Sequence, residues 1–137
     1  MRPPRRHWFV STSSSVDLDS LDLDPNERIL LVGLPPLAVI RRLAGRLENG
    51  IVVALGDGEQ IYALRRELAG EENVLVTPGS AEDIPWKDEF FSIVIDARGP
   101  QAHSAAAGRE MVRVLAAGGR LLRDGALILK PDPSPSA

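Results

Sequence analysis

The sequence of 137 residues contains no cysteine, which excludes disulfide bonds, zinc–thiolate sites and cysteine nucleophiles. The same absence fits a reducing compartment, so we expect a cytoplasmic protein. No apolar run approaches the roughly 20 residues that a membrane-spanning helix needs. The formal net charge of −3 supplies no basic excess for a general nucleic-acid surface. We therefore expect a protein that binds neither membranes nor nucleic acids.

Several catalytic patterns are also missing. The sequence has no Gly-x-Ser-x-Gly elbow and no Walker motif. Glu82 and Asp83 are adjacent acids without a histidine nearby in sequence, so no metal site is predicted. His103 is either a base that faces a ligand or an exposed residue at the start of a helix. We assign no catalytic residue.

What the sequence does contain is a regular alternation of apolar runs and helical periods. Continuous apolar runs of this kind are typical of parallel strands buried on both faces, and they stand at residues 28–33, 51–56, 73–79, 90–99 and 119–123. Amphipathic helical periods lie between them, at residues 36–50, 58–70 and 101–119. For the last helix we expect four inward residues, Ala105, Met111, Val112 and Leu115.

Strands that alternate with helices of this length indicate an α/β fold with a doubly wound, mostly parallel sheet in a three-layer sandwich. The pair Asp124-Gly125 between two apolar stretches is a hairpin signal. We therefore expect an antiparallel last strand beside the fifth.

Composition divides the chain into three parts. Residues 1–16 form a basic, serine-rich arm, which is either frayed or contributes a short added strand around His7–Val10. Residues 17–130 form one domain. Residues 131–137 hold three prolines and are expected to be a disordered tail.

From Asp17 to Arg123 the order of elements resembles the class I S-adenosylmethionine-dependent methyltransferases. "NVLVTPGSAEDIPWKDEFFSIVID" is similar to the family's strand, its Gly-Asp-Ala-Glu-Asp-Leu-Pro-Phe segment and the strand that follows. "REMVRVLAAGGRLL" is similar to the family's helix, Gly-Gly turn and fifth strand. The resemblance implies a Rossmann-like sheet with strand order 3-2-1-4-5 and a site for S-adenosylmethionine.

The motif that would hold this cofactor departs from the family pattern. The family has an acid followed by Gly-x-Gly-x-Gly, and the corresponding positions here are Leu31, Gly33, Pro35 and Leu37. Proline supplies no N–H group, and leucine adds a side chain where the ligand would lie. Of the four positions, Gly33 alone matches.

The remaining cofactor positions are matched in part. The acid that binds the ribose corresponds to Gly56, with Asp57 one residue later, either as its substitute or as part of a solvated turn that caps the next helix. Ser80 stands where the family has an Asp near the adenine, and Ala81 follows as in the family. Asp96 ends the fourth strand and either faces a ligand, caps the next helix or pairs with Arg98. The positional candidates for cofactor binding are Gly33, Gly56, Asp57, Ser80, Ala81 and Asp96.

These departures favour a methyltransferase-like domain with an eroded S-adenosylmethionine site, acting as an accessory or interaction module. An active methyltransferase with an atypical or partner-completed site is the alternative. A Rossmann-like domain that binds another small ligand at the same edge is a third interpretation. Family members continue further after the fifth strand, so we also expect a homodimer or a partner protein to cover the sheet edge.

Overall fold

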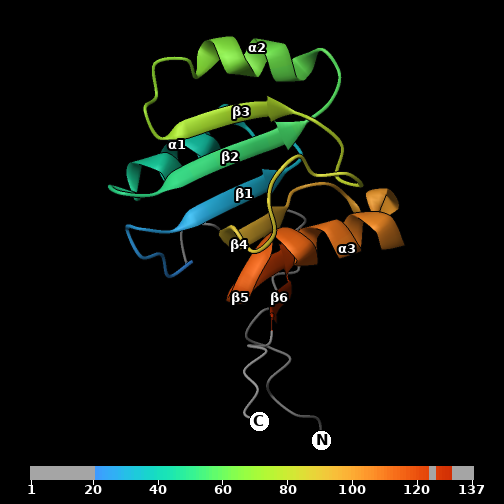
Figure 1. Cartoon of the computed structure of the whole chain (residues 1–137). Coiled ribbons are helices and arrows are strands. Elements are labelled where there is room, and N and C mark those ends of the chain that lie inside the picture. The colour runs from blue at the N-terminus through green and yellow to red at the C-terminus, as the bar shows by residue number, and fades with distance from the viewer. Residues whose placement is uncertain (1–20, 124–125, 131–137) are drawn as a thin grey trace, which may run out of the picture.

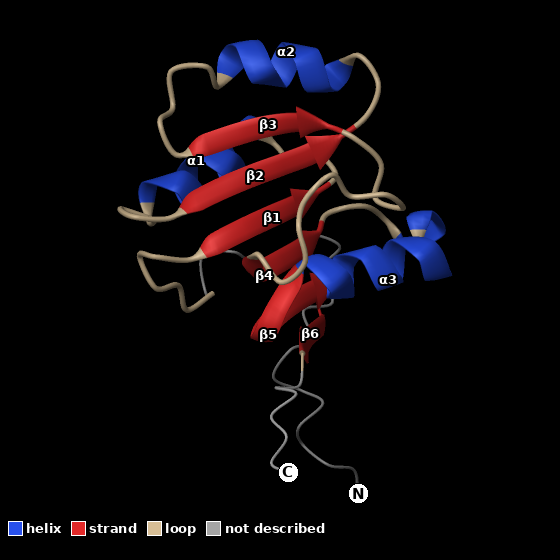
Figure 2. Cartoon of the chain, viewed as in Figure 1, coloured by secondary structure: helices blue, strands red, loops and turns tan. Residues whose placement is uncertain are grey.

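In this computed structural model, residues 21–123 and 126–130 are described, and they form a six-stranded sheet with helices on both faces (Figures 1 and 2). The strand order is β3-β2-β1-β4-β5-β6. All neighbouring strands are parallel except β5 and β6, which are antiparallel. The doubly wound, mostly parallel fold expected from the sequence is therefore confirmed, including its antiparallel last strand. The N-terminal arm, residues 1–16, and the tail, residues 131–137, lie outside the described residues.

The elements follow the alternation that the sequence predicts. The strands are β1 Arg28–Val32, β2 Ile51–Gly56, β3 Val74–Pro78, β4 Phe91–Asp96, β5 Leu115–Arg123 and β6 Ala126–Leu129. The helices are α1 Leu37–Gly45, α2 Gln60–Glu67 and α3 Ala105–Val114, with a short 3-10 helix η3 at Pro100–Ala102. No helix of the described ranges is long and apolar enough to cross a membrane.

The central strand β1 explains the unbroken apolar run in the sequence. Its residues Ile29–Val32 are buried, because they have a paired strand on each side and a helical layer on each face. Alternate residues point to opposite faces: Leu31 packs with α1 and α2, whereas Leu30 packs with α3. The sandwich thus has three layers and two apolar clusters separated by the sheet.

The helices divide between these two clusters. Ile40 and Leu43 of α1, with Ile61 of α2, pack on one face. Met111 and Val114 of α3 pack on the other. Figure 1 shows α3 in front of the sheet, α1 behind it and α2 beside the edge strand β3.

The last helix differs from its expected pattern at both ends. Residues 100–102 form η3, and α3 begins only after Ser104, whose hydroxyl accepts a hydrogen bond from the Ala107 amide at 3.1 Å. This start places Ala107, with Met111 and Val114, on the buried stripe. The expected inward positions of Ala105 and Val112 are therefore wrong, because both residues are exposed.

The closing hairpin joins β5 to β6. Arg123 pairs with Ala126, and the two residues that connect them, 124–125, lie outside the described residues. After β6, the Lys130 ammonium turns inward and donates to the carbonyls of Val112 at 2.8 Å and Leu115 at 2.6 Å. This contact ties the end of the hairpin to the end of α3, where a cation is favourable.

Candidate functional site

A cavity of about 320 Å³ opens at the carboxyl ends of the parallel strands. Its wall comes from the segments that follow β1, β2, β3 and β4, which meet at this edge of the sheet. This is the edge where open α/β sheets bind ligands. The lining residues are Val32, Gly33, Leu34, Leu55, Gly56, Asp57, Gln60, Gly79, Ser80, Ala81, Glu82 and Arg98.

Five of the six positional candidates for cofactor binding lie in this wall: Gly33, Gly56, Asp57, Ser80 and Ala81. The sixth, Asp96, is absent from the lining and its side chain is fully buried. The cavity therefore gathers residues that the sequence spreads over three separate segments. A role in binding stays a prediction for all six.

The turn after β1 depends on Gly33, which has a φ of +101°, a conformation that other residues rarely adopt. A methyl group added at Gly33 would lie 3.0 Å from Cγ of Arg98. The stem of Arg98 therefore covers this glycine from the side of β4. Pro36 precedes α1 as its N-cap residue and makes no side-chain cap bond.

The end of β2 is covered in a similar way by Leu34. A methyl group added at Gly56 would lie 2.9 Å from Cγ of Leu34 and 3.0 Å from Cδ2. The side chain of Leu34 thus occupies the space beside Gly56, the residue at the position of the family's ribose-binding acid. Asp57 is exposed on the cavity wall, and Glu59 takes the N-cap position of α2 without a side-chain cap bond.

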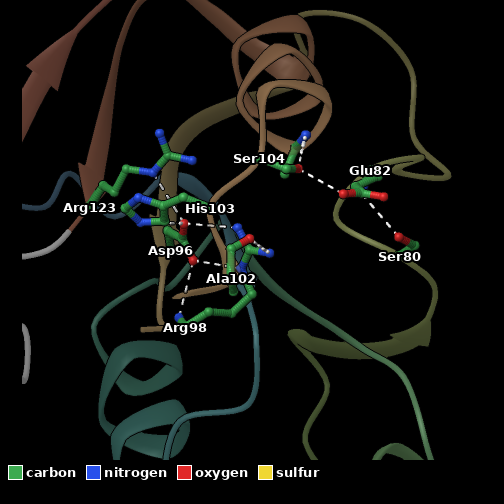
Figure 3. A network of polar contacts seen from close by, with 9 residues as sticks. Ser80, Glu82, Asp96, Arg98, Ala102, His103, Ser104 and Arg123 are labelled. Atoms are coloured by element: carbon green, nitrogen blue, oxygen red, sulfur yellow. Dashed lines mark hydrogen bonds and ion pairs between the residues drawn. The ribbon is translucent and has the colours of Figure 1, made fainter. Parts of the chain in front are cut away.

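The segment after β3 is fixed by a chain of polar contacts (Figure 3). The Ser80 hydroxyl accepts a hydrogen bond from the Glu82 amide at 3.0 Å. The Glu82 carboxylate in turn accepts a hydrogen bond from the Ser104 hydroxyl at 2.7 Å. These contacts connect one wall of the cavity to the start of α3, so the cap of that helix also positions Glu82.

Asp96 lies among Arg98, His103 and Arg123 (Figure 3). Its carboxylate accepts hydrogen bonds from Arg98 Nε at 2.9 Å and Nη2 at 3.0 Å, and from Arg123 Nε at 3.3 Å. His103 Nε2 lies 3.9 Å from the same carboxylate. Of the roles that the sequence left open for Asp96, the structure shows the pairing with Arg98. The next helix, α3, is capped by Ser104 and not by Asp96.

The environment of Asp96 favours its charged form. Burial raises the pKa of this carboxyl, but hydrogen bonds from the side chain and backbone of Arg98 outweigh burial. The net pKa of Asp96 therefore lies below its ordinary value. A carboxylate that is buried and already bonded to two arginines has no accessible oxygen for a ligand.

The loop between β3 and β4 is held to α3 by Arg113. Its guanidinium donates to the carbonyls of Ile84 at 2.8 Å and Trp86 at 2.9 Å, and to the Asp88 carboxylate at 2.7 Å. A hydrogen bond from Arg113 also lowers the pKa of Glu110. Trp86 contacts Phe90 and Phe91 at centroid distances of 5.8 and 5.5 Å, so the three rings pack together beside the loop.

Two residues that shape the cavity were not assigned to a site from the sequence. Leu34 carried no functional signal, because a leucine between a strand and a helix is ordinary. The sequence indicates Arg98 only as a partner for Asp96, because spacing along the chain does not show that the aliphatic part of the Arg98 side chain lies against Gly33. The described residues contain no group of three or more histidines and acids that could hold a metal ion.

The chain is similar to known methyltransferases in sequence and in fold. No protein-family model matches it. It is 29% identical over 122 residues to the Bacillus subtilis (strain 168) protein named "Putative methyltransferase YrhH", covering 85% of this chain and 67% of that protein. A solved S-adenosylmethionine-dependent methyltransferase from Aquifex aeolicus matches 69% of the chain with a TM-score of 0.63 and 20% identity.

A further solved structure contains two proteins. It is named "Complex between the Haloferax volcanii Trm112 methyltransferase activator and the putative methyltransferase", and it matches 76% of this chain with a TM-score of 0.64 and 17% identity. The present chain spans 54% of the Aquifex structure and 46% of the Haloferax structure, about half of their lengths. At these identities the two structures establish the fold.

Proposed function

We propose that this chain is a member of the class I S-adenosylmethionine-dependent methyltransferase superfamily and acts as a non-catalytic accessory or interaction module with an eroded cofactor site. The observation that carries the proposal is the side chain of Leu34 above Gly56. A carboxylate is needed there to bind the ribose in the pattern that the chain resembles. Here the position has no carboxylate, and a side chain added at Gly56 would require Leu34 to move.

The first strand supports the same conclusion. Leu31 stands at the position of the family's acid, fully buried in the cluster beneath α1. It has no charge to offer and does not line the cavity. Pro35 and Pro36 remove two backbone N–H groups from the turn that follows. On this proposal, S-adenosylmethionine does not fit the residues present.

The expected weakening of cofactor binding follows from the hydrogen bonds that these residues cannot make. A hydrogen bond to a charged group contributes about 1.5 to 3 kcal/mol, so the absence of two or three weakens binding by several kcal/mol. Each 1.4 kcal/mol is a factor of ten, so a micromolar cofactor moves to about the millimolar range. The expected outcome is a protein that does not retain this cofactor at micromolar concentration.

Titration calorimetry of the full chain with S-adenosylmethionine and S-adenosylhomocysteine tests the proposal. We expect no saturable heat at micromolar ligand. A matched pair of variants sharpens the test: Gly56→Asp alone adds a carboxylate without space, whereas Gly56→Asp with Leu34→Ala adds both. We expect the double variant to bind more tightly than the single one. Micromolar binding by the unmodified chain would overturn the proposal.

An active methyltransferase with an atypical or partner-completed site is the second candidate. It is favoured by Asp57, an exposed carboxylate on the cavity wall one residue after Gly56. The Haloferax neighbour, solved with its activator, supports a protein partner as one route to completion. In this case micromolar binding of S-adenosylhomocysteine is expected, and Asp57→Asn weakens it at least tenfold, while the exposed Asp83→Asn does not.

A further inference from the structure

The outer edge of β6 is open within the part of the chain that the structure describes. β6 pairs with β5 on one side and is the last strand in the sheet order. Natural edge strands are commonly protected against further pairing by lysine, proline or a bulge. Ala126–Leu129 has the sequence Ala-Leu-Ile-Leu, without charge or proline. The ammonium of the adjacent Lys130 is turned inward to α3.

The same strand exposes large apolar side chains on both faces of the sheet. Ile128 is 46% exposed and pairs with Leu121, which packs in the cluster beneath α3. Leu129 is 62% exposed and belongs to the opposite face, because side chains alternate along a strand. An additional strand with apolar side chains on both faces would cover both residues and satisfy the open backbone groups.

The geometry points to His7–Val10 of this same chain as that strand. These four residues lie outside the described residues, and they contain Trp8, Phe9 and Val10, which are among the residues that favour strands most. Pro3-Pro4 and Ser11–Ser15 bound the run on either side. In a strand, Trp8 and Val10 face one way and Phe9 faces the other, so both faces of the β6 edge receive an apolar side chain.

The start of the described chain lies within reach of this edge. The Asp22 carbonyl accepts a hydrogen bond at 2.9 Å from Arg120 Nη2, and Arg120 on β5 pairs with Leu129 on β6. A strand added outside β6 would lie two strand spacings from β5, about 10 Å. The ten residues 11–20 span up to about 33 Å when extended. His7–Val10 can therefore reach the edge without any rearrangement of residues 21–23.

Tryptophan fluorescence tests the added strand directly. The chain has two tryptophans, so Trp86→Phe leaves Trp8 as the single reporter. In this background we expect Trp8 emission at a shorter wavelength than that of a solvated tryptophan, with reduced quenching by acrylamide. Phe9→Pro removes an N–H group from the strand and should return Trp8 to solvated emission, whereas Ser13→Pro, outside the strand, should not. Solvated emission from Trp8 in the Trp86→Phe chain would overturn the proposal.

Amide hydrogen exchange supplies an independent measurement on the receiving strand. In the full chain, Phe9→Pro should accelerate exchange at Ala126–Leu129 and leave β1 unchanged. A pair of substitutions compares the two edges of the sheet. Leu129→Lys on β6 should return Trp8 to solvated emission, whereas the control Leu75→Lys on the opposite edge strand β3 should not.

Light scattering distinguishes the N-terminal segment from a second copy of the chain as the occupant of the β6 edge. A monomer with protected β6 amides supports the proposal, and a dimer whose β6 protection survives Phe9→Pro contradicts it in favour of a second copy.

Discussion

Asp96 and Arg98 are separated by one residue, yet the carboxylate of the first is bound at both oxygens by the guanidinium of the second. Arg98 Nε lies 2.9 Å from Oδ1, and Nη2 lies 3.0 Å from Oδ2. The Asp96 side chain is fully buried, whereas Arg98 remains one-fifth exposed. The acid at the carboxyl end of β4 thus fixes the path of the chain out of the sheet and holds Arg98 across Gly33.

Replacement of Asp96 tests the energetic weight of this pair. Asp96→Asn keeps the shape of the side chain but leaves two arginines without a counter-charge. We expect the free energy of unfolding to fall by about 2 to 4 kcal/mol, because removal of one partner from a buried ion pair leaves the other charge without compensation. Urea denaturation measures the change. The exposed control Asp83→Asn should stay within about 0.5 kcal/mol of the unmodified protein, and an equal loss in both variants would contradict the assignment.

The lowered pKa of Asp96 predicts how this loss depends on pH. An unfolded aspartate has a pKa of about 3.9, so the folded-state contribution is fully present above that value and is lost as pH falls through the lower folded pKa. The stability gap between the unmodified protein and Asp96→Asn should therefore be constant above about pH 5 and shrink below about pH 4. Urea midpoints along a pH series check this, and a gap that widens in acid would refute it.

Arg113 should control the order of the loop after β3. Arg113→Met removes its hydrogen bonds to the carbonyls of Ile84 and Trp86 and its ion pair with Asp88. We expect faster amide exchange across residues 84–88 and a loss of about 1 to 3 kcal/mol in the free energy of unfolding. Arg113→Lys should restore only part of the protection, because an ammonium cannot reproduce the fork of donors. The neighbouring exposed Arg109→Met should leave the loop unchanged.

Two glycines offer a matched test of backbone packing. A methyl group at Gly50 would overlap the carbonyl oxygen of Glu27, so Gly50→Ala should destabilise the protein by about 2 kcal/mol or more. Gly45, at the end of α1, has no atom within 4 Å of the added methyl group. Gly45→Ala should stabilise by about 0.5 to 1 kcal/mol, because alanine favours the helix and restricts the unfolded chain. Thermal denaturation compares the pair, and equal shifts would contradict the packing at Gly50.

The sequence was sufficient to predict the layers of the fold, because burial on both faces leaves a direct signature. Ile29–Val32 could only be a central strand, and Asp124-Gly125 correctly predicted an antiparallel partner for β5. The phase of α3 was wrong because its first turn is nearly all alanine, which marks no face. Ser104 was the signal that could have corrected it, since a serine before an alanine run is a helix cap.

The candidate site was only partly accessible to the same reasoning. Positions such as Gly56 and Ser80 could be placed in one wall, because the carboxyl ends of parallel strands share an edge. The covering of Gly33 by Arg98, and of Gly56 by Leu34, depends on side-chain directions across neighbouring strands. No periodicity or motif in the sequence predicts those directions. The contacts of Arg98 with Gly33 and of Leu34 with Gly56 are therefore known only from the structure.

The central place of β1 also has a consequence for how the chain reaches its native state. Ile29 pairs with Val52 on one side but with Ile93, 64 residues later, on the other. During synthesis, β1 can pair early with β2, but its second edge stays open until β4 leaves the ribosome. Loop closure over such a distance slows folding. Until then, β1, whose residues Ile29–Val32 are buried in the native sheet, is paired on one side only, and this interval is when the nascent chain most needs protection from aggregation.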